Sequence, residues 1–137
     1  MVDAFIYDAI RTPRGKARPD GGLAALTPAA LVAHLTDALR DRCDDRLDRI
    51  GALYLGCVTQ AGDQGGHIAL ASKFAAGLPD SCAAHSLNNY CASGLSAIGH
   101  AVAKLVRHIA QHGGQGRADH RAAYFATTTG QAVVLQR

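Results

Sequence analysis

The feature that most constrains this fold is a threefold alternation of short apolar segments with longer segments of helical periodicity. Residues 4–10, 52–57 and 82–88 have the length and composition of strands, and a helical pattern follows each one. We expect the helices over about 28–42, 67–76 and 92–106. Because such alternation gives parallel strands joined by helices, the sequence predicts a layered α/β fold with a largely parallel sheet.

The first helical segment carries the clearest local signals. Thr27 provides a hydroxyl that can cap a helix, and Pro28 suits the first helical position. Leu31, Leu35 and Leu39 then recur at helical spacing, which gives the segment one apolar face. We expect that face to pack in the core.

The strand–helix pattern weakens after residue 106. Residues 111–116 are typical of a loop or linker, and only residues 131–135 look like another strand. Residues 107–137 hold four arginines against Asp119, which accounts for the whole net charge of +3. We therefore divide the chain into an α/β segment, 1–106, and a divergent basic, Gly-rich tail, 107–137. A solvated tail is favoured over a nucleic-acid-binding one, because the arginines are few and spread out.

Several classes of protein are disfavoured by composition. No apolar run approaches the roughly 20 residues that a membrane helix needs. Residues 1–8 lack a charged leader and an apolar core segment, so we expect no secretory signal. Four cysteines without paired spacing indicate free thiols in a reducing cytoplasm. The histidines are dispersed and show no metal-ligand spacing, so no metal site is expected.

The most informative position for chemistry is Cys91, which falls in a predicted strand-to-helix turn. The helix dipole and the backbone N–H groups of a helix start favour a thiolate, the nucleophilic form of cysteine. Its small neighbours Ala92, Ser93 and Gly94 would let an acyl group approach the sulfur closely. The residues alone equally allow a buried structural cysteine. For Cys57, which follows a strand, a place in the core is favoured.

Three sequence blocks together suggest a family. They read Ile-Tyr-Asp-Ala-Ile-Arg-Thr-Pro-Arg-Gly-Lys over 6–16, Leu-Gly-Cys-Val-Thr-Gln-Ala-Gly-Asp-Gln-Gly-Gly over 55–66, and Asn-Asn-Tyr-Cys-Ala-Ser-Gly-Leu-Ser-Ala-Ile over 88–98. The first resembles the opening of thiolases, the second their second strand and following loop, and the third the segment that holds their acylated cysteine. The resemblance covers roughly residues 3–106.

This resemblance implies a thiolase-like layered fold, of which the chain holds the N-terminal half of a duplicated β-α-β-α-β core. It implies acyl transfer between Cys91 and coenzyme A, in 3-ketoacyl-CoA cleavage or acetyl-CoA condensation. Coenzyme A would be a co-substrate, and no cofactor would be bound permanently. The strand before Cys91 would lie near a two-fold dimer axis, while Arg11, the loop after it and Gly94 would be mainly structural.

The chain also departs from the family pattern. The later Gly-His-Pro histidine, the Asn-Glu-Ala segment of an oxyanion hole and the C-terminal Cys-Gly-Gly cysteine are not found in it. His100, within Gly-His-Ala, lies on a predicted helix and is given no catalytic role. We therefore expect an incomplete enzyme that needs a homodimer or a complementing chain. The alternative is a non-catalytic thiolase-like module for dimerisation or partner binding.

Overall fold

The computed structural model describes residues 4–16, 18–43, 46–112, 122–127 and 131–136. Its elements are β1 (Phe5–Arg11), α1 (Pro28–Cys43), β2 (Ile50–Gly56), α2 (Ile68–Ala75), β3 (Ala83–Leu87), α3 (Ser93–His112), β4 (Ala122–Thr127) and β5 (Gln131–Gln136), with short 3-10 helices at Arg46–Arg49 and Gly62–Gln64. The predicted succession of three strand–helix pairs is confirmed. Among the described residues, none of the helices combines the length and apolar character needed to cross a membrane.

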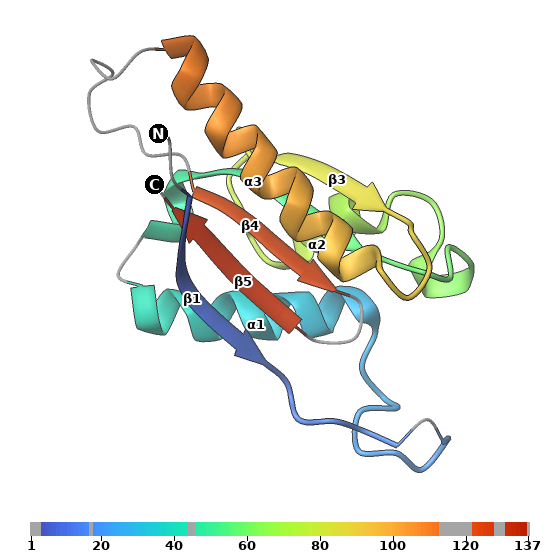
Figure 1. Ribbon diagram of the computed structural model, residues 1–137. Helices are drawn as coiled ribbons and strands as arrows, with labels where there is room; N and C mark the ends of the chain where they lie inside the picture. The colour runs from blue at the N-terminus through green and yellow to red at the C-terminus, as the bar shows by residue number, and fades with distance from the viewer. Residues whose placement is uncertain (1–3, 17, 44–45, 113–121, 128–130, 137) are drawn as a thin grey trace.

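The strands form one sheet in the order β1-β5-β4-β2-β3. Strands β4, β2 and β3 pair in parallel, whereas β5 is antiparallel to both of its neighbours, β1 and β4. Four strands therefore run in one direction and β5 runs against them (Figure 1). The prediction of a layered α/β fold with a largely parallel sheet is confirmed.

The region after residue 106 differs from the sequence prediction. Helix α3 continues to His112, so residues 111 and 112 are helical rather than part of a loop. Strand β4 was not predicted, because its segment Ala-Ala-Tyr-Phe-Ala-Thr is short and half alanine. In the sheet, β4 and β5 lie between β1 and β2. The sequence pattern predicted β1 and β2 as successive strands along the chain but did not predict which strands pair. The division of the chain at residue 106 stays a prediction, although both parts contribute strands to this sheet.

Strand β2, which lies between β4 and β3, contributes to both faces of the core. Its side chains alternate, so Leu53 and Leu55 pack among the apolar residues of α1 and α2. On the opposite face, Ala52 and Tyr54 pack against Ala97 and other small or apolar residues of α3. Figure 1 shows the result as three layers, with α3 across one face of the sheet and α1 on the other.

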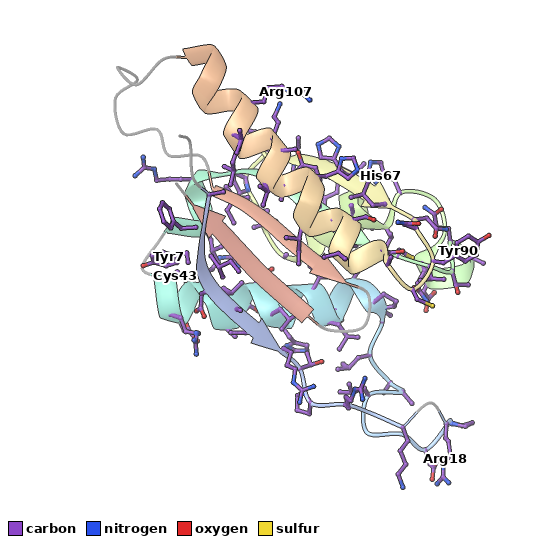
Figure 2. All side chains as sticks on the ribbon, viewed as in Figure 1. Tyr7, Arg18, Cys43, His67, Tyr90 and Arg107 are labelled. Carbon is purple, nitrogen blue, oxygen red and sulfur yellow. The ribbon has the colours of Figure 1, made fainter. Side chains whose placement is uncertain are left out.

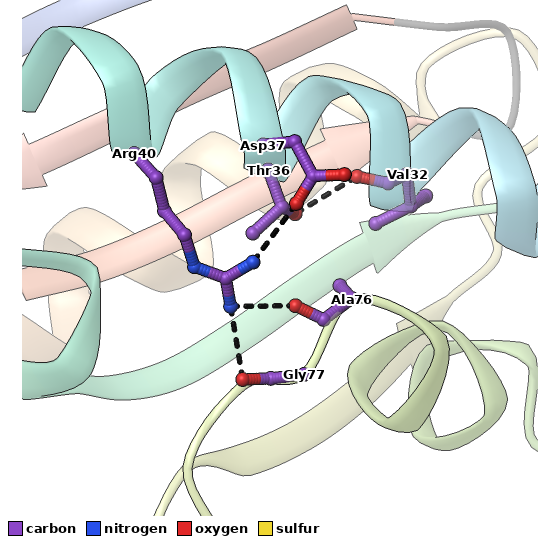
Figure 3. A network of polar contacts seen from close by, with 6 residues as sticks. All are labelled: Val32, Thr36, Asp37, Arg40, Ala76 and Gly77. Atoms are coloured by element: carbon purple, nitrogen blue, oxygen red, sulfur yellow. Dashed lines mark hydrogen bonds and ion pairs between the residues drawn. The ribbon is translucent and has the colours of Figure 1, made fainter.

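Hydrogen bonds from Arg40 connect helix α1 to the end of helix α2. The Nη2 atom of Arg40 in α1 donates hydrogen bonds to the carbonyl oxygens of Ala76 and Gly77, at 2.7 and 2.9 Å (Figure 3). Its Nη1 atom donates to Asp37 Oδ1 at 2.9 Å. Because the last carbonyls of a helix lack partners within the helix, the guanidinium satisfies the C-terminal end of α2.

The N-terminus of α1 is capped as predicted. The Thr27 hydroxyl accepts a hydrogen bond from the Ala30 amide.

Candidate active site

The turn between β3 and α3 brings Cys91 to one edge of the sheet. Strand β3 ends at Leu87 and α3 begins at Ser93, so Cys91 lies just before the first helical residue. Since β2 and β3 are parallel neighbours, their carboxyl ends meet at this edge, and the Cys57 amide donates to the Leu87 carbonyl at 2.9 Å. The sequence prediction of a cysteine in a strand-to-helix turn is confirmed. Its predicted catalytic role is a separate question.

All four cysteines lie within the described residues, and only Cys91 among them is exposed. Cys57 is buried, as predicted, and its thiol donates to the side-chain oxygen of Gln64 at 3.3 Å. Burial raises the pKa of the Cys82 thiol, which keeps that sulfur in its weakly nucleophilic protonated form. Cys91 is thus the cysteine that a dissolved thioester can reach.

The residue before Cys91 has an unusual backbone conformation. Tyr90 has a φ of 47°, in the left-handed region that side-chain-bearing residues seldom adopt. Its side chain is 78% exposed and projects from the turn (Figure 2), so the burial of the ring does not hold this conformation. The hydrogen bonds of the turn must hold it instead.

Two polar side chains supply those bonds. The side-chain oxygen of Asn88 accepts from the Tyr90 amide at 3.0 Å, and its Nδ2 donates to the Val58 carbonyl at 3.0 Å. Ser93, which is buried, accepts from the Asn89 amide at 2.9 Å and donates to the Tyr90 carbonyl at 2.6 Å. The residues on both sides of Cys91 are therefore fixed to each other and to the loop after β2.

Close backbone packing fixes the start of α3 against β2. A Cβ atom at Gly56 would lie 2.7 Å from the Ser93 carbonyl carbon and 2.8 Å from the Gly94 amide nitrogen. Only glycine fits at the end of β2 without displacing the helix start. The resemblance assigned close packing here to Gly94, and the structure adds Gly56 as the partner on the sheet. The sequence signal was a glycine ending an otherwise apolar strand.

The histidines of this region lie around β3. His85 stacks on Tyr54 with ring centroids 4.6 Å apart, and burial, together with the nearby Lys104, lowers its pKa. The Nδ1 atom of His67 accepts from the Leu70 amide at 3.3 Å and so caps α2. His100 lies on α3, as predicted, and its side chain is exposed. Within the described residues, no histidine is hydrogen-bonded to the Cys91 sulfur, and no cluster of three potential metal ligands occurs.

Comparison with known proteins identifies this architecture. Residues 4–123 match the family described as "Thiolase, N-terminal domain". The chain belongs to the thiolase family. Its curated relatives include a beta-ketoadipyl-CoA thiolase of Pseudomonas knackmussii, which is 41% identical over 99 residues, covering 71% of this chain and 24% of that protein. A 3-ketoacyl-CoA thiolase of Bacillus subtilis is 36% identical over 106 residues, covering 77% of this chain and 27% of that protein.

The fold of this thiolase-family chain is also found in solved structures. The Bacillus anthracis acetyl-CoA acetyltransferase superposes with a TM-score of 0.72 at 20% identity, covering 90% of this chain and 28% of that one. The fold described above is therefore shared with this solved structure. The chain spans about a quarter of the length of the relatives it matches.

Proposed function

We propose that this chain supplies the acyl-accepting cysteine of a thiolase-type acyltransferase. In this proposal, the Cys91 thiolate attacks the carbonyl carbon of an acyl-CoA thioester. The carbon–sulfur bond to coenzyme A breaks, coenzyme A leaves as its thiol after gaining a proton, and the acyl group remains as a Cys91 thioester. With a 3-ketoacyl-CoA, the carbon–carbon bond beside the attacked ketone breaks instead and the released fragment is acetyl-CoA. The carbon released in that cleavage gains a proton to complete acetyl-CoA. The thiol of free coenzyme A then attacks the Cys91 thioester, takes the acyl group and restores the cysteine, so coenzyme A is the co-substrate and no resident cofactor takes part.

The observation that carries the proposal is the placement of Cys91. It is the exposed cysteine, it lies two residues before the first residue of the 20-residue helix α3, and its turn is braced on both sides. A braced turn holds the sulfur where a substrate can be positioned against it. The thiolase relatives act on CoA thioesters by name, which agrees with this chemistry.

Full turnover requires acid–base and oxyanion-hole groups whose family motifs do not occur in this sequence. General acid–base assistance typically contributes about 10²–10⁴-fold, and each oxyanion-hole donor about 10²–10³-fold. We propose that these groups lie in the part of a thiolase that corresponds to the other three quarters of its relatives. Strand β3, which leads to Cys91, is an edge strand of the sheet, so it can pair with a second copy in a cytoplasmic homodimer.

The test is intact mass spectrometry of the purified chain before and after incubation with acetyl-CoA. We expect the mass to increase by one acetyl group, the label to map to the peptide that contains Cys91, and Cys91→Ala to remain unlabelled. Cys57→Ala is the matched control, because it removes a buried thiol, and it should label as the wild type does. A folded chain that gains no acetyl group would refute the proposal and favour a non-catalytic thiolase-like module.

A further inference from the structure

A surface cavity lies beside the connection between β1 and α1, and none of its lining residues belongs to the Cys91 turn. Its volume is about 550 Å³, and Arg14, Lys16 and Arg18 are among the residues that line it. Leu23 and, in α1, Leu31 also line it. Figure 2 shows Arg18 at the far end of this connection, away from the sheet. The lining therefore combines cationic and aliphatic side chains.

The two limbs of the loop are packed against each other. A Cβ atom at Gly15 would come within 3.1 Å of the Leu23 side chain, and one at Gly21 would overlap the Lys16 carbonyl oxygen. Successive turns are closed by bonds from the Arg18 amide to the Lys16 carbonyl and from the Gly21 amide to the Arg18 carbonyl, both at 2.9 Å. Backbone contacts within this connection thus hold the lining residues in place.

The positive charges that line the cavity are only partly compensated. Arg18 forms two hydrogen bonds with Asp20, at 2.8 and 3.1 Å, and both side chains are exposed. Within the described residues, neither Arg14 nor Lys16 takes part in an ion pair. Two of the lining residues therefore carry a positive charge with no ion-pair partner in the described part of the chain.

We propose that this cavity binds a phosphate monoester that carries a short apolar chain. An arginine and a lysine together complement a dianionic phosphate, the arginine through paired N–H donors. The volume lies within the range of about 300–1,000 Å³ that is usual for small-molecule sites, and it exceeds what a lone phosphate fills. Leu23 and Leu31 offer apolar surface to the rest of the ligand. This site is independent of acyl transfer to Cys91.

The test is calorimetric titration of the whole chain with hexyl phosphate, inorganic phosphate and hexyl glucoside. Hexyl phosphate should bind saturably, and inorganic phosphate should bind at least about tenfold more weakly because it lacks the apolar chain. The neutral glucoside should show no saturable binding. Affinity for hexyl phosphate should also fall as salt is raised from 20 to 500 mM, because exposed charges are screened.

The double variant Arg14→Ala/Lys16→Ala should weaken hexyl phosphate binding by about tenfold or more, since it removes both uncompensated charges. Lys104→Ala, an exposed lysine on α3, is the matched control and should bind as the wild type does. Circular dichroism of each variant verifies that it is folded. Unchanged affinity in the double variant, or equal binding of the glucoside, would overturn the proposal.

A lipid headgroup presents the same phosphate chemistry at a membrane surface. Flotation with phosphatidylcholine vesicles that contain phosphatidic acid distinguishes this source from a dissolved ester. Binding to such vesicles without saturable binding of hexyl phosphate would also overturn the proposal, because a concave site of this size must accept the monomeric ester.

Discussion

The bonds from Arg40 to the end of α2 should contribute more to stability than any ion pair among the described residues, because they satisfy carbonyl groups that the helix leaves without partners. Its two bonds to the Ala76 and Gly77 carbonyls come from a charged donor on a side chain that is 33% exposed. Hydrogen bonds to charged groups contribute about 1.5–3 kcal/mol each when well buried. Partial exposure reduces this to about 1 kcal/mol each, so Arg40→Met should lower the free energy of unfolding by about 2 kcal/mol.

The neighbouring pair provides the internal control. Asp37 is 67% exposed and pairs with Arg40 across one turn of α1, so Asp37→Ala should cost less than about 0.5 kcal/mol. Arg40→Lys should fall between the two, because a single ammonium does not span two carbonyls and a carboxylate as a planar guanidinium does. Urea denaturation followed by circular dichroism at 222 nm measures all three. A cost for Arg40→Met no larger than that for Asp37→Ala would show that the helix-end bonds contribute nothing.

Three further predictions concern packing and charge elsewhere. Ser72→Ala should raise the free energy of unfolding, measured in urea, by about 1 kcal/mol, because the Ser72 hydroxyl is buried without a hydrogen-bond partner among the described residues. A loss of stability in this variant would contradict the prediction. Gly56→Ala should lower the melting temperature and change the rate at which iodoacetamide alkylates Cys91, whereas Gly22→Ala, with open space around it, should do neither. The hydrogen bond from Arg42 lowers the pKa of Asp8 below 3.8, so this pair stabilises the fold above that pH. The stabilisation is lost as pH falls through the lowered pKa. The acid-unfolding curve of Arg42→Gln should therefore lack this pH-dependent loss of stability.

The elements that the sequence predicted are those with strong local signals. The Thr27 cap and the leucine spacing after it are properties of one segment, and α1 forms as they indicate. Strand β4 has no comparable signal in its own composition. Pairing with its neighbours β2 and β5 stabilises it instead. The place of β5 between β1 and β4 likewise depends on pairing across more than 100 residues, which no local pattern encodes.

The same distinction applies to the candidate site. The turn that holds Cys91 follows from a strand signal, a helix signal and the residues between them. The groups that anchor it to the sheet do not, because Gly56 ends a different strand and Val58 lies in the loop after it, and both reach the turn only when β2 and β3 pair in parallel. Since Asn88, which accepts from the Tyr90 amide, is itself bonded to the Val58 carbonyl, the position of the Cys91 sulfur is a property of the assembled sheet edge. A peptide of residues 82–106 should therefore lack the acetylation that we propose for the whole chain, even though it contains the cysteine and its helix.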